Sequence, residues 1–364
     1  MESEELRARL ERMERGALFR EEFRIRNFLE GDFFGWYLKA WTPDIEKQIR
    51  SIVEKLSNYD PTTLEVSPEQ TRDLLKKLYH YLMPRELRHD LGEYYTPDWL
   101  AERLLTQVDS SLFQPLTTDA ARRQSLAYAQ KNLLKLRFLD PACGSGTFIV
   151  LTIRRIRDLA QRLRMESSNE KKRWVLEAIL NNVQGIDLNP LAVIAARTNY
   201  ILALGDLMQI LNRPEIDIPI YLADSILTPS LGEDIFTGGN YRIKTTVGEF
   251  LVPEAFNTKD RIDALAHALD EAVEAKPKVS ADNFVARVNV AAGLSDKELE
   301  KAHRSLADLY KKLSELHSKG LNGVWARIIK NAFMPLFIGK FDYVVGNPPW
   351  VNWESLPGDY RQDT

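Results

Sequence analysis

Residues 138–148 read FLDPACGSGTF, and this stretch decides the fold. An apolar run over 133–139 leads into it, which predicts a buried strand, and residues 148–163 repeat apolar side chains with helical spacing. The stretch is therefore predicted to be the tight turn between a strand and a helix. Gly144 and Gly146 lack a Cβ, so the backbone can turn sharply there and approach a ligand closely.

The residues of this turn argue against phosphate binding. They include neither the Lys-Ser/Thr pair that closes a P-loop nor the three spaced glycines of the dinucleotide fingerprint. Asp140, at the carboxyl end of the predicted strand, can accept hydrogen bonds from an ammonium or a hydroxyl group. The turn therefore favours a nucleoside that carries an amino acid over a polyphosphate. An ordinary strand-to-helix turn is the alternative if nothing else matches.

A second apolar run ends in an acidic residue in the same way. Residues 184–190 read QGIDLNP and lead into a helix predicted over 191–204, so Asp187 lies at the end of a second strand. A carboxylate at that place typically binds ribose hydroxyls. The alternative role for Asp187 is to cap the helix, which Asn189 can do instead with Pro190 at the first helical position.

A third strand is predicted within residues 218–225, which read IPIYLADS. It ends at Asp224. Taken alone, Asp224 is a turn residue. Taken in order with Asp140 and Asp187, it is a third carboxylate at a strand end, placed to hold the exocyclic amine of an adenine.

The last strand pattern, 341–346 (FDYVVG), runs directly into Asn347, Pro348, Pro349 and Trp350. Two successive prolines forbid a helix and lack backbone donors, so this loop is stiff. The side-chain oxygen of Asn347 and the main-chain carbonyl of Pro348 are placed to accept the two hydrogens of an amine. Trp350 supplies a flat face for a ring. A proline turn with a core tryptophan is the alternative interpretation.

Together these motifs resemble the S-adenosylmethionine-dependent DNA adenine methyltransferases, in the order that places the cofactor motifs before the catalytic one. Residues 91–97 (LGEYYTP) add to the resemblance, because that family places a similar segment before its first strand. The chain is most similar to the large fused restriction-modification or phage-defence methylases, which share the lead-in 85–90 (RELRHD). The resemblance covers roughly residues 80–230 and 335–353.

The resemblance implies S-adenosylmethionine as the cofactor and no metal. It assigns the cofactor to Thr96, Asp140, Ala142, Gly144, Gly146, Asp187, Leu188 and Asp224, and catalysis to Asn347, Pro348, Pro349 and Trp350. Thr96 would contact the methionine carboxylate, Asp140 and the Ala142 backbone the methionine end, Asp187 the ribose, and Leu188 and Asp224 the adenine.

The implied reaction is methyl transfer to the exocyclic amine of an adenine in double-stranded DNA, in host protection or phage defence. The base must leave its helix, which costs a few kcal/mol, and stacking on Trp350 would return roughly 1 to 3 kcal/mol. Two other functions are weighed. One is an amino-methyltransferase that acts on protein glutamine or RNA, and the other is a noncatalytic cofactor-binding scaffold in a defence complex.

The composition is compatible with this function without identifying it. The 364-residue chain has a formal net charge of -3, so it lacks the overall basic charge of an isolated DNA-binding domain. DNA affinity would have to come from local patches or from a missing part, and the solvated face of a helix is the favoured alternative for most of the candidate residues. The candidates are Arg154, Arg155, Arg157, Arg162, Arg164, Lys171, Lys172 and Arg173.

A single cysteine excludes a disulfide framework and a cysteine-rich zinc site, and it suits a reducing cytoplasm. Cys143 lies in the glycine turn, where it is interpreted as a small packing residue. The charged amino terminus is not a signal peptide, and no membrane span is expected.

The predicted fold is α/β, a Rossmann-like class I methyltransferase sheet with a helical amino-terminal region and a helical insertion. The predicted domains are a helical domain over 1–90, the cofactor-binding half over 91–230, a mostly helical insertion over 231–335 with helices at 261–275 and 296–318, and the catalytic strand and loop over 336–364. Few residues follow Trp350, so we expect the sheet to be incomplete and the chain to be an amino-terminal fragment. The rest of a parent chain, or other defence-system subunits, would then complete it.

Overall fold

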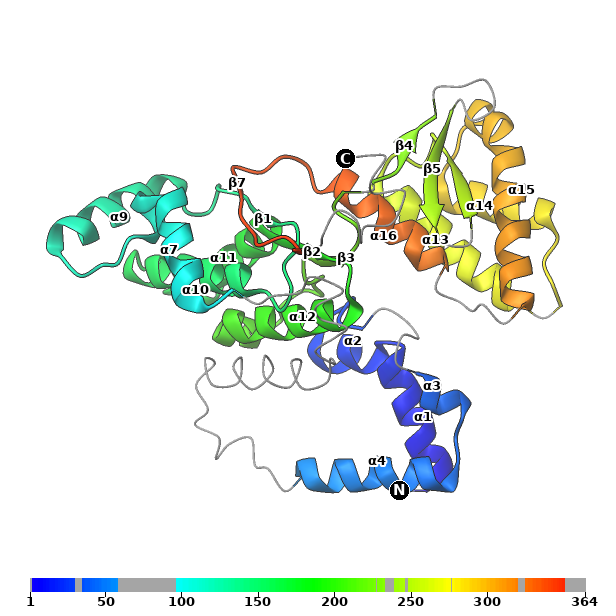
Figure 1. Cartoon of the computed structure of the whole chain (residues 1–364), viewed down its shortest axis with the longest axis horizontal. Helices are drawn as coiled ribbons and strands as arrows, with labels where there is room; N and C mark the ends of the chain where they lie inside the picture. The colour runs from blue at the N-terminus through cyan, green and yellow to red at the C-terminus, as the bar shows by residue number, and fades with distance from the viewer. Residues whose placement is uncertain are drawn as a thin grey trace. The chain divides into compact units, whose positions relative to one another are not determined.

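The computed structural model describes residues 2–29, 35–57, 96–226, 228–232, 239–245, 248–275, 277–319 and 325–350. The chain divides into two compact units, one of residues 1–222 and 340–364 and one of residues 223–339 (Figure 1). Each unit has its own hydrophobic core. The lead-in 85–90 and all of the 91–97 motif except Thr96 and Pro97 lie outside the described residues.

A parallel four-stranded sheet lies at the centre of the first unit and confirms the α/β prediction. Its strand order is β3-β2-β1-β7. The strands are β1 (Phe138–Asp140), β2 (Val183–Asp187), β3 (Ile220–Leu222) and β7 (Tyr343–Val344). The chain therefore moves outward from β1 to β3 and returns on the other side of β1 with β7. In such sheets the place where the strand order reverses is where ligands bind.

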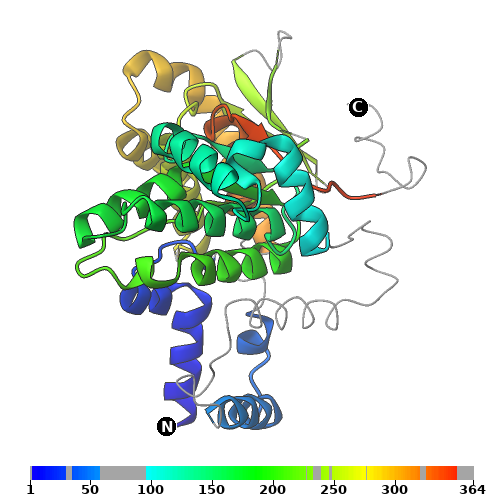
Figure 2. The same cartoon turned by 90° about the vertical axis from the view of Figure 1, so that its left-hand side faces the viewer.

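Helices connect and flank these strands. The described helices of the first unit are α1 (Ser3–Glu14), α2 (Ala17–Phe23), α3 (Trp36–Lys39), α4 (Pro43–Ser57), α7 (Asp98–Val108), α8 (Ser110–Phe113), α9 (Asp119–Asn132), α10 (Thr147–Arg162), α11 (Asn169–Asn182), α12 (Pro190–Leu204) and the 3-10 helix η1 (Gly205–Gln209). α10 and α12 lie side by side and pack on β2 (Figure 1, Figure 2). Side chains of Thr118, Ser168 and Asn189 accept backbone N–H groups and so begin α9, α11 and α12.

The first strand is shorter than predicted. The apolar run 133–139 was expected to be strand throughout, but β1 begins only at Phe138. Leu133 is instead the C-cap of α9, and its side chain is buried in the same core as Phe138. One apolar run therefore contains both the end of a helix and the start of a strand. Hydrophobic periodicity alone does not show where the one ends and the other begins.

α12 and η1 together form a longer apolar stretch than expected, since no stretch of membrane-spanning length was predicted. The stretch Pro190–Gln209 is long and apolar enough to cross a membrane, and half of its most apolar window is buried inside the protein. Arg197, Asn199 and Tyr200 are among its buried side chains. This combination is typical of a core helix.

The extended segment after α2 attaches the amino-terminal helices to the edge of the sheet next to β3. Ile25 forms a parallel bridge with Ile216. The buried Asn27 side chain donates to the carbonyl of Ile218 at 2.8 Å and accepts its N–H at 2.7 Å. The buried Arg197 guanidinium donates to the carbonyls of Asn27 and Ile220. These helices are therefore part of the first unit.

The second unit combines a small antiparallel sheet, in the order β4-β5-β6, with four described helices. Its elements are β4 (Ser230–Leu231), β5 (Asn240–Thr245), β6 (Gly248–Pro253), α13 (Lys259–Glu274), α14 (Ala281–Ala292), α15 (Asp296–Ser318) and α16 (Trp325–Phe337). α15 has the predicted bounds 296–318, and α13 lies close to the predicted 261–275. The sheet, α14 and α16 were not predicted.

Candidate functional site

The two main motifs meet where β1 and β7 end side by side. The N–H of Val345 donates to the carbonyl of Leu139 at 2.9 Å, so β7 continues its pairing up to the loop. A Cβ placed on Gly346 would lie 2.6 Å from Asp140 Oδ1 and 3.3 Å from Pro141 Cδ. The backbone just before Asn347 therefore touches the Asp140 carboxylate, and only glycine fits there.

The glycine turn adopts the predicted strand-turn-helix geometry. Gly144 and Gly146 both have positive φ angles, of 53° and 85°, and α10 begins directly after Gly146. A Cβ on Gly146 would lie 3.4 Å from the Cβ of Ala196, so the turn packs closely on α12. Cys143 is buried, its N–H donates to Ile186 O at 2.9 Å, and burial raises the pKa of its thiol. These features suit packing better than nucleophilic chemistry.

Asp187 joins this turn to the start of α12. Its Oδ2 accepts the N–H of Gly144 at 2.7 Å, and its Oδ1 accepts the N–H of Asn189 at 2.8 Å. Asn189 caps α12 through Leu191 N–H at 3.0 Å, with Pro190 in the first turn. The capping role therefore belongs to Asn189, as expected, and Asp187 faces the glycine turn.

Asp140 is the most strongly perturbed carboxylate here. It is 2% exposed, and Oδ1 accepts the N–H of Ala142 at 3.2 Å. The pKa of Asp140 is raised to about 8: burial is the largest cause, the Ala142 N–H partly opposes it, and the charge of Asp187 adds to it. A buried carboxyl that gives up its proton when a cation binds, beside the Asp187 carboxylate, favours ammonium and hydroxyl donors over phosphate. The site therefore suits the predicted amino-acid nucleoside.

The remaining cofactor residues of the prediction occupy three places. Thr96 is buried directly before α7, whose Ala101 and Leu105 pack with Phe148 of α10. Leu188 follows β2 with its side chain 59% exposed, as an apolar face beside the strand ends. Asp224 belongs to the second unit and accepts the N–H of Ile226 at 2.8 Å.

The Asn-Pro-Pro-Trp loop presents its side chains outward. Trp350 is 73% exposed, so it is not a core tryptophan. Its indole Nε1 donates to Asn347 Oδ1 at 2.9 Å. Pro348 and Pro349 are also exposed, and Asn347 is half-buried. An exposed ring and an amide oxygen therefore lie together, immediately beyond the Asp140 contact.

Three supporting contacts were missed because their partners are far apart in sequence. Tyr343 stacks on Phe138 with ring centroids 4.8 Å apart and donates its hydroxyl to Asp109 Oδ2 at 2.7 Å. Burial and hydrogen bonding to Tyr128 and Asp109 raise the pKa of Tyr343. Asn199 Nδ2 donates to the Ser145 carbonyl at 2.9 Å, which holds the glycine turn from α12. A glycine directly before Asn347 is a local signal that the backbone passes close to another group, as it does at Gly346. No local pattern indicates the other contacts.

Two of the basic residues of α10, Arg155 and Arg157, have structural partners. Arg157 donates to the Leu204 carbonyl at 2.8 Å and pairs with Glu166 at 3.2 Å and with Asp206. Arg155 also binds backbone carbonyls, those of Leu112 and Gln114. Both guanidinium groups are mostly buried, so they belong neither to a DNA-binding patch nor to the solvated face of a helix.

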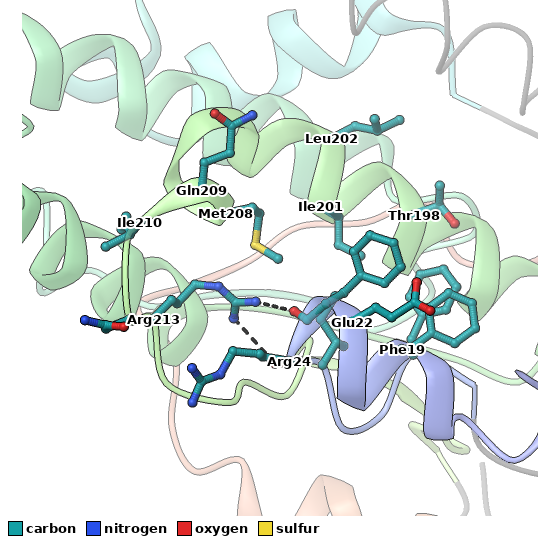
Figure 3. Close-up of a pocket in the computed structure, with 14 residues that line it drawn as sticks. Phe19, Glu22, Arg24, Thr198, Ile201, Leu202, Met208, Gln209, Ile210 and Arg213 are labelled. Atoms are coloured by element: carbon teal, nitrogen blue, oxygen red, sulfur yellow. Dashed lines mark hydrogen bonds between the residues drawn. The ribbon is translucent and has the colours of Figure 1, made fainter. Parts of the chain in front are cut away.

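A cavity of about 440 Å³ lies elsewhere in the first unit, between α2, the segment after it and the end of α12 (Figure 3). Arg213 extends across it and donates to the carbonyls of Phe23 and Arg24. Its lining is mostly apolar and includes Phe19, Phe28 and Met208. None of the predicted cofactor or catalytic residues lines this cavity, so it is separate from the strand-end site. Across the described ranges, no cluster of three or more His, Cys, Asp or Glu could hold a metal ion.

Comparison with known proteins matches the two ranges that contain these motifs to methyltransferase families. Residues 116–215 match the DNA-methyltransferase domain of MmeI, and residues 181–364, half of the chain, match the Eco57I restriction-modification methylases. A protein of Methanocaldococcus jannaschii, predicted to be a type II restriction enzyme and methyltransferase, is 27% identical over 187 residues. The adenine-specific methyltransferase PglX of Streptomyces coelicolor is 35% identical over 72 residues.

Each match covers a larger share of this chain than of the relative. The first covers 43% of this chain and 16% of the archaeal protein, and the second covers 19% of this chain and 6% of PglX. The chain thus matches only a small part of each relative's length. No solved structure matches it significantly.

Proposed function

The chain belongs to the Eco57I restriction-modification methylases, and from this premise we propose that it carries the core of a DNA adenine methyltransferase that uses S-adenosylmethionine. Its sheet is then the Rossmann-like sheet of a class I enzyme. The contact between Gly346 and Asp140 carries the proposal, because it joins a cofactor motif to an amine-binding loop at the place where the strand order reverses.

The donors and acceptors around the glycine turn fit S-adenosylmethionine. Asp140 and Asp187 supply acceptors for an ammonium and for ribose hydroxyls, and Thr96 supplies a hydroxyl for the carboxylate. The backbone of Ala142, Gly144 and Gly146 allows close approach. The exposed Leu188 is assigned to the adenine. Bound there, the cofactor supplies an electrophilic methyl group on a sulfonium.

The protein's own contribution to transfer comes from the loop. The nitrogen of an aromatic amine is a weak nucleophile because its lone pair is delocalised into the ring. Asn347 Oδ1 and the Pro348 carbonyl accept its two hydrogens, which localises the lone pair on nitrogen. Trp350 stacks on the ring and orients it. These are positioning and electrostatic effects, and they need no strongly basic side chain.

Adenine in double-stranded DNA is the proposed substrate. The matched relative PglX is named an adenine-specific methyltransferase, and both family matches are to methylases of restriction-modification systems. The base is flipped out of its helix to reach the loop. Longer chain segments or other subunits of a defence system are the proposed partners that supply sequence recognition, and the proposed place of action is the cytoplasm.

The test is Asn347→Ala in the full-length protein. Losing the amine acceptor is expected to lower methyl transfer to DNA by about 10²-fold or more while leaving S-adenosylmethionine binding unchanged. Calorimetric titration measures binding, and transfer of a radiolabelled methyl group into DNA measures activity. Asp140→Ala is the matched control, since it should abolish cofactor binding. Retained methylation in Asn347→Ala would exclude the proposed amine acceptor.

A further inference from the structure

Trp350 donates its indole hydrogen to the oxygen that the proposed function reserves for the target amine. The Nε1 to Oδ1 distance to Asn347 is 2.9 Å. We propose that the indole is an internal competitor, which occupies this acceptor until an amine-bearing base replaces it. The proposal rests on the proposed function and adds a regulatory step at the same site.

The two partners differ in how firmly they are held. Asn347 is half-buried, and it directly follows the Gly346 contact with Asp140. Trp350 is 73% exposed, so its ring can move without breaking core packing. Pro348 and Pro349 stiffen the backbone between them and keep the ring near the amide. The acceptor is therefore fixed and the donor is movable.

This competition depends on tryptophan at position 350. The indole nitrogen is a donor only, so it must face the oxygen of the Asn347 amide. Phenylalanine offers a similar flat face for stacking but has no such donor. A ring at this position can therefore stack on a base in either case, whereas only the indole also covers the acceptor.

When an amine binds, the hydrogen bond from the indole to Asn347 Oδ1 is broken and one from the amine forms. The amine-bearing base therefore gains no additional hydrogen bond at this oxygen. A purine without an exocyclic amine brings no donor, so it stacks while the indole stays on the oxygen. A single neutral hydrogen bond changes an equilibrium roughly two- to tenfold. The indole should therefore weaken binding of amine-bearing bases by about that factor and leave other bases unaffected.

The hydrogen bond is tested first in the ligand-free chain labelled with ¹⁵N-tryptophan. The Trp350 indole signal is assigned by its loss in Trp350→Phe. Asn347→Leu, which removes the acceptor at similar size, should shift this signal and speed its hydrogen exchange. Asn347→Asp, which keeps an oxygen, should preserve its protection. Identical indole signals in the wild type and Asn347→Leu would overturn the proposal.

The competition is tested with two single-stranded oligonucleotides, one of deoxyadenosine and one of deoxynebularine, whose purine lacks the amine. Single strands remove the cost of base flipping. Only the deoxyadenosine strand should move the indole signal. Its affinity relative to the deoxynebularine strand should rise roughly two- to tenfold in Trp350→Phe, since the stacking loss cancels in this ratio.

An unchanged or lower ratio would overturn the competition, and so would an indole signal that deoxyadenosine leaves in place. Failure of the proposed function looks different. It would appear as no methyl transfer to DNA by the wild-type full-length protein, while the indole signals of the ligand-free chain would be unaffected.

Discussion

Burial determines the protonation of Asp140. Its ordinary pKa of 3.8 is raised to about 8, chiefly by burial. Without a cationic ligand, the folded protein therefore keeps a proton on this carboxyl up to about pH 8. The unfolded chain releases the same proton near its ordinary pKa. Between these two values the folded state binds more protons, so its stability falls as pH rises.

Asp140→Asn tests this proton linkage, because asparagine is a neutral group of the same shape. The wild type should lose stability relative to the variant between about pH 5 and 8, with a limiting slope of about 1.4 kcal/mol per pH unit. Chemical denaturation of the ligand-free chain across this range measures the difference. Asp119→Asn, whose side chain is 83% exposed, is the control and should follow the wild type. Parallel stability profiles for the wild type and Asp140→Asn would refute a buried neutral Asp140.

At the scale of elements, the Asn27 side chain makes the kind of main-chain hydrogen bonds that a neighbouring strand would make, where the amino-terminal segment meets the sheet. Its amide makes both hydrogen bonds to the main chain of Ile218 within buried surroundings. Asn27→Leu would leave that N–H unpaired, whereas the Ile218 carbonyl would keep the N–H of Ile220 at 2.8 Å, so we expect a loss of roughly 1 to 3 kcal/mol. The neighbouring Arg26 pairs with Asp217 at 2.7 Å, but its side chain is 50% exposed. Arg26→Ala should therefore cost less than about 1 kcal/mol.

Denaturant unfolding of the two variants measures this contrast. Equal losses would mean that the segment is held by its surface charges and that Asn27 does not act as part of the sheet edge. The contrast also bears on the cofactor site, because the Arg197 guanidinium, which binds the Asn27 carbonyl, belongs to the helix that carries Ala196 under the glycine turn.

Elements were predicted correctly where the residue pattern fits only one kind of secondary structure. The turn at 138–148, the helix after Pro190 and the helix 296–318 each combine a strong period with a local end signal, and all three are confirmed. β5 and β6 were missed although Phe250 and Val252 alternate with less buried residues, because two six-residue strands give a weak signal.

The site could be predicted only in its local parts. Motif residues are neighbours in sequence, so their chemistry can be read directly. The contact of Gly346 with Asp140 and the hydrogen bond of Tyr343 with Asp109 join residues about 200 positions apart. Such pairs depend on strand order, which the sequence pattern of one strand does not contain. The arginines of α10 show the same limit, because their carbonyl partners lie on other elements.

At the scale of the molecule, each of the two units has its own large hydrophobic core among the residues that the structure describes. Ile153 is fully buried in the core around the parallel sheet, and Leu269 is fully buried in the core of residues 223–339. No residue belongs to both cores in the described part of the chain. Units with their own cores are expected to unfold as separate cooperative transitions.

We therefore expect two transitions in differential scanning calorimetry, each sensitive to its own core. Ile153→Ala and Leu269→Ala should each cost about 2 to 5 kcal/mol and lower a different midpoint by several degrees. Saturating S-adenosylmethionine should raise the midpoint that Ile153→Ala lowers, because a ligand stabilises the unit that binds it. A single transition lowered alike by both substitutions would show that the inserted residues 223–339 fold only together with the parallel sheet, so that the cofactor core and the insertion form one cooperative unit.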